Sequence, residues 1–455
     1  MKTRGIAGLI GIAAVALVAA GNMAPGGTES TWRMPRVVRL HTSAVFTYFP
    51  ASLFVMSAAV GGEPQGLLLR DGDLVAGDST LFIYRDSDGP ELTTGIRSGI
   101  VSVGGVPVSM GLNEIGARGW LDRASTAELA RLRLVGFADS IPAGLWPAIR
   151  RLAAANPNVG MSLGSSENAA ALLTLFKPTL LVVGEWKSDP LPSLADQSQL
   201  ETLLIPADDS GALDGLDRLP KLRQLFLGKW DADVTGPLPE GMKALRSLVA
   251  TEWSGDSTLA PLHNAPPELE ELSLLGARVT DISGVRAFPE LRTLLLNHSP
   301  NLTDLRPLAA LTKLQWLGLP PKTSQAQFDA IVISHPALKI IDLTSVEGVT
   351  DLASLKGLKD LRALILSDTV YDLRALPDLK TLQFVGVGAP SKDSAAAVAR
   401  RVAAVRKALP DALVVPMSPM CLGSGWILLL LPVVALFWCA ATRSRPRTLA
   451  SAVSG

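Results

Sequence analysis

The pattern L-x-x-L-x-L constrains this 455-residue chain more than any other feature, because it returns at an almost constant spacing. Its copies begin at Leu200, Leu222, Leu245, Leu269, Leu291, Leu314, Leu338, Leu361 and Leu379, with a degenerate copy at Pro178. Successive starts lie 22 to 24 residues apart, and only the last interval is shorter, at 18 residues. A pattern that repeats at a fixed period of this length predicts a stack of similar structural units.

The residue types inside each copy predict the geometry of one unit. Alternate side chains of a β-strand face opposite sides, so Leu225 and Leu227 should point into a core while Gln224 and Phe226 point away from it. No single unit can enclose its own leucines, whereas stacked units share one continuous core. We therefore expect an α/β solenoid with one parallel β-strand per repeat.

Four repeats also carry an aspartate at the same place in their second half. The motifs are Val279-Thr-Asp-Ile282, Leu302-Thr-Asp-Leu305, Val349-Thr-Asp-Leu352 and Val370-Tyr-Asp-Leu373. We expect each aspartate to cap a turn or a short helix by accepting backbone N–H groups. With the leucine pattern, these motifs resemble the internalin-like class of bacterial leucine-rich repeats over about residues 270 to 385. The resemblance implies a leucine-rich-repeat fold.

One position departs from that class. Its consensus places asparagine eight residues after the first leucine, where the side chain satisfies backbone groups between successive units. Here the position holds Asp208, Ala277, Ser299, Lys322, Val346 and Thr369. The buried backbone groups of these turns must therefore find other hydrogen-bond partners.

The repeat array is expected to span residues 122–390, since Ser125-Thr-Ala-Glu128 is a capping-box pattern that opens a helix just before the first weak repeat. Residues 391–416 are expected to form a C-terminal cap whose helix has Val398, Val402 and Val405 on one face. Residues 22–121 are expected to be rich in β-strands. The predicted strands there are Gly66–Arg70, Ser79–Arg85 and Ile100–Met110.

Both ends of the chain predict a membrane topology. Residues 1–21 have a basic start and a short apolar run, which is typical of a signal peptide or a signal anchor. Residues 421–442 carry no charge over a length that can span a bilayer, and the basic tail 443–455 follows at once. We expect a single transmembrane helix with a cytoplasmic tail and the repeats outside. Residues 43–62 are a second uncharged stretch, for which we favour a buried or membrane-adjacent segment over another crossing.

Composition argues against several kinds of chemistry. Lys plus Arg equals Asp plus Glu at 42 each, so no net charge favours nucleic acid. The two cysteines, Cys421 and Cys439, lie in the predicted membrane helix, which excludes a disulfide framework and a cysteine zinc site outside it. The four histidines show no metal-ligand spacing, and no phosphate loop or nucleophile motif is present. The sequence predicts no cofactor, no metal and no enzymatic activity.

Two surface patterns remain as candidates for partner binding. The outward centres of four consecutive strands are apolar, at Val182, Leu204, Phe226 and Val249. These residues either form a protein-binding stripe or merely reflect the strand propensity of such side chains. Three tryptophans stand eight residues after their repeat starts, each with an acid three residues later, at Trp186, Trp230 and Trp253. These indoles either line an interface or pack between units.

The sequence therefore predicts a membrane-anchored protein of the cell envelope that binds a protein partner through the concave face of a solenoid. The identity of that partner is not encoded in the repeats. Two alternatives stay open. The tryptophans suit recognition of carbohydrate or peptidoglycan, and residues 63–120, for which no family is recognised, leave room for an envelope enzyme.

Overall fold

The computed structural model describes residues 100–417 apart from short gaps, and six strands before residue 96. The gaps are 104–105, 113–114, 133, 138–139, 166–167, 186–193, 208, 252, 256, 276–277, 298, 368, 370, 383 and 389–394. The predicted signal segment, transmembrane helix and basic tail lie outside the described residues. Of the uncharged stretch 43–62, the structure describes only the strand β3 (Met56–Val60).

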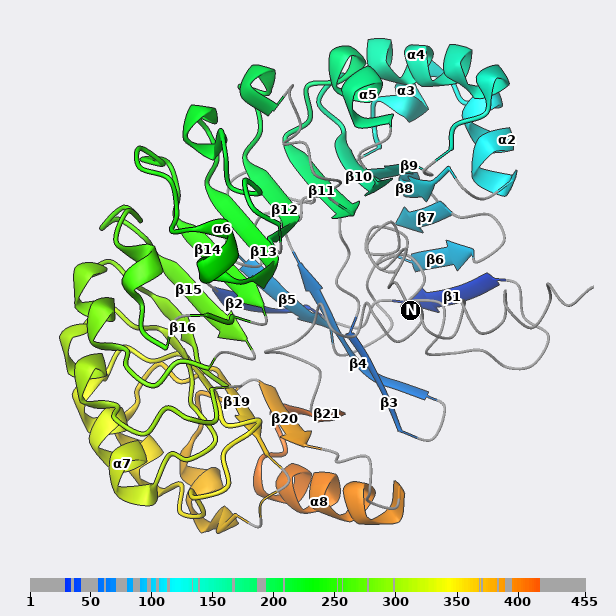
Figure 1. The fold of residues 1–455 in the computed structure, drawn as a ribbon. Helices are drawn as coiled ribbons and strands as arrows, with labels where there is room; N and C mark the ends of the chain where they lie inside the picture. Colours follow the sequence, from blue (N-terminus) through cyan, green and yellow to red (C-terminus); the bar gives the residue numbers. More distant parts are fainter. Residues whose placement is uncertain are drawn as a thin grey trace, which may run out of the picture.

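Thirteen parallel strands follow one another along an arc, each paired with the next in chain order. They are β9 (Leu134–Phe137), β10 (Gly160–Ser165), β11 (Leu180–Glu185), β12 (Thr202–Ala207), β13 (Gln224–Trp230), β14 (Ser247–Thr251), β15 (Glu271–Leu275), β16 (Thr293–Leu295), β17 (Trp316–Gly318), β18 (Ile340–Asp342), β19 (Ala363–Leu366), β20 (Phe384–Gly388) and β21 (Leu413–Met417). Figure 1 shows these strands on the inner side of the arc. The predicted solenoid of one parallel strand per repeat is confirmed.

The register follows the leucine pattern. Leu225 pairs with Leu248, Leu248 with Leu272 and Leu272 with Leu294, so the equivalent leucines form a continuous ladder. Leu294 is fully buried. The apolar core extends through the described coils from Met110 to Val414, as expected for units that can bury their leucines only against their neighbours.

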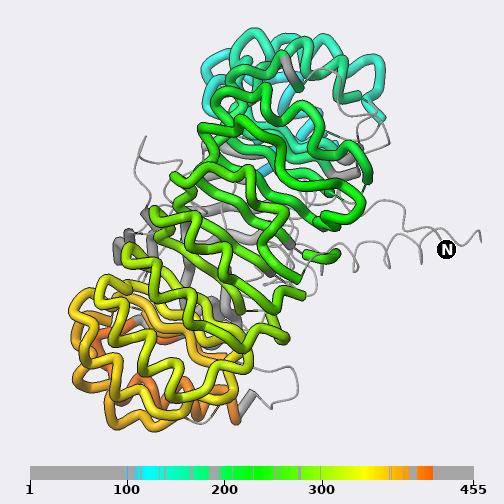
Figure 2. Tube along the Cα trace, turned by 60° about the vertical axis from the view of Figure 1, so that its left-hand side comes forward, coloured from blue at the N-terminus to red at the C-terminus, as the bar shows by residue number. Residues whose placement is uncertain are grey.

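Helices and short turns form the outer side of the arc. The α-helices are α2 (Ile115–Arg123), α3 (Thr126–Leu129), α4 (Trp146–Ala155), α5 (Ala169–Leu175), α6 (Ala232–Thr235), α7 (Gln325–Ser334) and α8 (Ala395–Ala408). The 3-10 helices are η2 (Ala143–Leu145), η4 (Leu194–Asp196), η5 (Leu216–Arg218), η6 (Ala260–Leu262), η7 (Ser283–Ala287), η8 (Arg306–Ala310), η9 (Ala353–Gly357) and η10 (Leu373–Asp378). Figure 2 shows the coils stacked side by side from the cyan end to the orange end. On α8 the valines 398, 402 and 405 are buried, as the helical spacing predicts.

The N-terminal strands form two groups. Strands β1 (Glu29–Arg33), β6 (Glu91–Gly95), β7 (Ile100–Val103) and β8 (Val106–Gly111) pair antiparallel in that order, and β8 joins the solenoid by pairing parallel to β9. Strands β2 (Val37–His41), β5 (Thr80–Tyr84), β4 (Glu63–Arg70) and β3 form a separate antiparallel sheet. Figure 1 shows this second sheet inside the curve of the arc, and β3 and β4 both approach β21.

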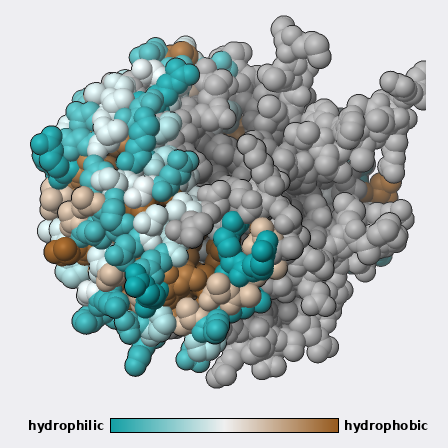
Figure 3. Space-filling model, turned by 90° about the horizontal axis from the view of Figure 1, so that it is seen from below, coloured by the Kyte–Doolittle hydropathy of each residue, from teal (hydrophilic) through white to brown (hydrophobic). Residues whose placement is uncertain are grey.

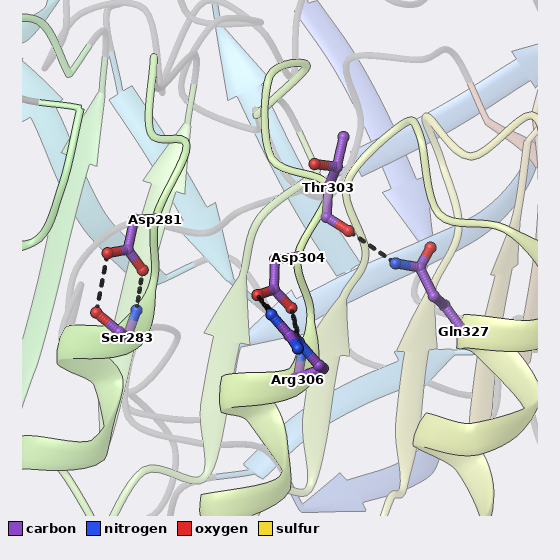
Figure 4. A network of polar contacts seen from close by, with 6 residues as sticks. All are labelled: Asp281, Ser283, Thr303, Asp304, Arg306 and Gln327. Carbon is purple, nitrogen blue, oxygen red and sulfur yellow. Dashed lines mark hydrogen bonds and ion pairs between the residues drawn. The ribbon is translucent and has the colours of Figure 1, made fainter.

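The predicted caps are present. Ser125 accepts the N–H of Glu128, whose carboxylate accepts the N–H of Ser125, which completes a capping box at α3. Each motif aspartate accepts the N–H two residues further on, and Figure 4 shows the first two examples. The distances are 2.7 Å for Asp281, 3.0 Å for Asp304, 2.8 Å for Asp351 and 3.0 Å for Asp372. The structural role predicted for these carboxylates is confirmed.

Side chains at positions other than that of the missing asparagine ladder link successive coils. On the outer side of the arc, amide and imidazole nitrogens reach back about one coil to backbone carbonyl oxygens. The pairs are Asn156–Leu132 at 2.8 Å, Gln197–Leu173 at 3.1 Å, Asn264–Leu238 at 2.8 Å and His335–Leu308 at 3.0 Å. Near the C-terminal end, the hydroxyls of Ser367 and Thr369 both donate to the carbonyl of Val346.

Across the part of the chain that the structure describes, no helix has both the length and the apolar character needed to cross a bilayer.

Candidate interaction surface

The concave face is the side of the parallel sheet that points away from the core. It has two rows of side chains, set by the strand register. The first row contains Leu180, Thr202, Gln224, Ser247, Glu271, Thr293, Trp316, Ile340, Ala363 and Phe384. The second row contains Ser162, Val182, Leu204, Phe226, Val249, Ser273, Leu295, Gly318, Asp342, Ile365 and Gly386. All of these residues are buried, and the most exposed of them, Phe226, is only 8% exposed.

The predicted stripe lies in the second row. Val182, Leu204, Phe226 and Val249 form a cluster with Leu134 and Leu180 that is separate from the core. Their outward orientation is therefore confirmed, but the expectation that they are exposed is wrong. Removing apolar side chains from water lowers the free energy. The sheet formed by β2 to β5 lies on this side of the arc and can cover them. Partner binding by these four residues stays a prediction.

The tryptophan positions take a different place. Trp230 and Trp253 are 0% and 1% exposed and belong to the core. Their rings meet edge to face with centroids 4.6 Å apart, and the Trp230 Nε1 donates to the Thr235 hydroxyl at 2.9 Å. For these two residues the packing interpretation is confirmed and the aromatic rim is wrong, because the vacant asparagine position leaves room for an indole inside the coil. Trp186 lies outside the described residues.

Polar side chains interrupt the apolar rows at the middle of the arc. Ser247 donates to a carboxylate oxygen of Glu271 at 3.0 Å, and Thr202 donates to the side-chain oxygen of Gln224 at 3.4 Å. These contacts join side chains of adjacent strands. Burying a polar group costs free energy unless its hydrogen bonds are made. Any polypeptide that covers this stretch of the face must therefore preserve the hydrogen bonds of these pairs or replace them.

A second polar cluster surrounds Asp342, at the end of β18. Its Oδ1 accepts the backbone N–H of Thr344 at 2.9 Å and also the Thr344 hydroxyl. Nδ2 of Asn297 donates to the Asp342 carbonyl oxygen at 3.4 Å. Burial raises the pKa of the Asp342 carboxyl to about 6, while the hydrogen bonds from Thr344 act in the opposite direction.

Gly318 and Asp342 stand four residues after the repeat starts Leu314 and Leu338, the same spacing as Phe226 has from Leu222, but this spacing alone predicts no role for them. The available signal was an acid in a row that is otherwise apolar or small. Asn297 was missed because it lies beyond the end of β16, where the repeat pattern makes no prediction. Among the described residues, no group of His, Cys, Asp and Glu is arranged to hold a metal ion.

The remaining surface of the described coils offers little apolar area. The large apolar side chains that stay exposed there are Ile115, Val234 and Ile333, which lie on three different helices. In the view of Figure 3 the described surface is mainly hydrophilic, and hydrophobic residues form small separate patches. Apolar residues outside the core therefore gather on the concave face.

No family model matches the sequence, and no curated protein matches it. Among solved structures, an internalin from Listeria monocytogenes is similar, with 20% identity, 68% of this chain and 92% of that chain covered, and a TM-score of 0.40. Internalin C2 from the same organism shows 22% identity, coverage of 51% and 80%, and a TM-score of 0.28. A leucine-rich-repeat protein of Leptospira interrogans shows 15% identity, coverage of 63% and 91%, and a TM-score of 0.36. The solenoid assignment rests on the strand ladder and the coil repeat described above.

Proposed function

We propose that this chain is a scaffold that binds another protein through the concave face of its solenoid and is held at a membrane by its C-terminal segment. The observation that supports it most is the apolar cluster of Leu134, Leu180, Val182, Leu204, Phe226 and Val249 on that face.

The cluster is informative because its residues do not belong to the solenoid core. The inward leucines, such as Leu225 and Leu248, already fill the space between strands and outer helices. Apolar residues on the opposite face stabilise the fold only when other polypeptide covers them. Their burial here indicates a surface suited to polypeptide contact.

The membrane part of the proposal rests on the sequence. Residues 421–442 are uncharged and are followed by Arg443, Arg445 and Arg447. A segment of this kind anchors a chain with its basic side in the cytoplasm. The solenoid then lies in the cell envelope, outside the cytoplasm, where a concave surface meets proteins of the periplasm or the exterior.

The test is in-cell cross-linking followed by affinity capture of the full chain. A true partner of the concave face is captured by the wild type and reduced by Phe226→Ala, which removes a large side chain from the centre of the cluster. We expect a loss of about 1 to 3 kcal/mol of binding free energy, the usual range for an interface anchor. Both proteins are compared at a temperature at which circular dichroism shows them folded, because Phe226 is buried.

Ile333→Ala provides the matched control, since Ile333 is an apolar residue of the outer side and is 75% exposed. A partner that the Ile333 variant loses and the Phe226 variant keeps would place the binding surface on the outer side of the arc and contradict the proposal.

A further inference from the structure

Two buried oxygen atoms near the C-terminal half of the concave face have no hydrogen-bond partner among the described residues. They are Oδ2 of Asp342 and Oδ1 of Asn297, whose residues are both fully buried. The other atoms of these side chains are engaged, since Asp342 Oδ1 accepts from Thr344 and Asn297 Nδ2 donates to the Asp342 carbonyl. A buried acceptor without a donor costs free energy, so an unfilled pair marks a place where a donor belongs.

The chain makes room for this pair. A Cβ atom at Gly318 would stand 1.9 Å from Asn297 Oδ1, so only glycine allows the amide to lie across β17 toward Asp342. Turning the amide over does not satisfy it. The oxygen would then face the Asp342 carbonyl oxygen, which is also an acceptor.

The chemistry of the pair limits what can fill it. Mg²⁺ and Ca²⁺ need about six or more oxygen ligands, and one carboxylate with one amide falls far short. A planar guanidinium has several N–H donors in a fixed fork, forms charge-assisted bonds with a carboxylate and stacks on aromatic rings. The first-row neighbour on β17 is Trp316, a buried aromatic side chain on the same face.

We propose that Asp342 and Asn297 bind the guanidinium group of an arginine carried by the protein that occupies the concave face. This inference rests on the proposed function and adds the chemistry of the partner. We assign the arginine to a second polypeptide, because Asp342 Oδ2 accepts no hydrogen bond from the described residues.

The flanking strands of the solenoid supply no compensating charge to Asp342 on the concave side. On the concave side of the flanking strands β16, β17 and β19, the residues are Thr293, Leu295, Trp316, Gly318, Ala363 and Ile365, and none of these carries a charge. Burial holds the pKa of Asp342 at about 6, so the carboxyl is ionised at pH 7.5 and largely neutral at pH 5. Arginine binding should therefore weaken as the pH falls through 6.

The experiment measures the melting temperature of the full chain in detergent in the presence of N-acetylarginine amide. The probe is added at several times its expected Kd, which is in the millimolar range. N-acetylcitrulline amide is the neutral isostere. For the wild type at pH 7.5 we expect the arginine probe to raise the Tm by about 1 to 2 °C more than the citrulline probe. This difference should vanish in Asp342→Asn and should shrink at pH 5.

Asp360→Asn is the matched control, since Asp360 is an exposed aspartate of the same half of the arc. It should keep the wild-type difference. Equal shifts with both probes in the wild type, or a difference that survives in Asp342→Asn, would overturn the arginine site. The capture experiment with Phe226→Ala uses different residues, so its success beside a failed probe experiment removes only the arginine site.

Discussion

Among the described residues of the solenoid, Asp342 is the one whose charged form is most disfavoured by burial. Its carboxyl is fully buried, and burial raises its pKa from the usual 3.8 to about 6. A raised pKa means that the folded state prefers the protonated form. The stability that this preference contributes is complete below pH 3.8 and is lost as the pH rises through 6.

Asp342→Asn should therefore stabilise the chain at pH 7.5 by up to about 3 kcal/mol, from 1.36 kcal/mol per pKa unit over the shift from 3.8 to about 6. At pH 4 the two proteins should differ little, since the aspartate is then mostly neutral in the folded state. Urea unfolding at both pH values measures this difference. An equal gain at pH 4 and pH 7.5 would mean that charge is not the cause.

Among the structural elements, one coil stabilises the next, because each strand contacts only its two neighbours in the ladder. Leu294 is the middle residue of β16 and is fully buried between Leu272 and Leu317. Leu294→Asp places an unpaired charge in the core, which costs several kcal/mol in a site that offers no partner. We expect the coils around β16 to unfold.

Hydrogen exchange of the full chain measures this effect, with lost protection in β15, β16 and β17 as the expected result. Leu294→Met is the control, since it keeps an apolar side chain of similar volume. Full protection of β15 and β17 in the aspartate variant would contradict the inward position of Leu294.

At the same scale, the leucine spacing predicted the strand ladder because packing inside a coil depends on residues within a few positions of one another. The aspartates of the second halves were also predictable, since a cap forms with the N–H two residues away. The cover over the concave face was not predictable in this way. Phe226 is buried on the side of the arc where the sheet formed by β2 to β5 lies, and no local pattern specifies a contact between segments so far apart in sequence. Trp230 and Trp253 were ambiguous for a related reason, because their position alone does not say whether an indole turns inward or outward.

The topology of the whole molecule stays a prediction of the sequence. The charge asymmetry around residues 421–442 places residues 22–420 outside and the arginine-rich tail inside. Protease added to intact cells should cut the chain outside the compact solenoid and should leave an epitope tag fused after Gly455 protected. The orientation is wrong if the external protease removes the tag and leaves residues 122–416 intact.

The unequal width of the two sides of each coil gives the arc its curvature. Parallel strands stand about 4.8 Å apart, whereas an α-helix with its side chains is about 10 Å across, so α4, α5, α7 and α8 need more room on the outside than the strands do inside. The slimmer 3-10 helices of the middle coils, η5 to η9, reduce that demand. The packing of strands and helices thus sets the radius of the inner surface as the chain folds. A protein that binds there meets a surface whose backbone entropy has already been lost in folding, and its affinity is not reduced by ordering the solenoid.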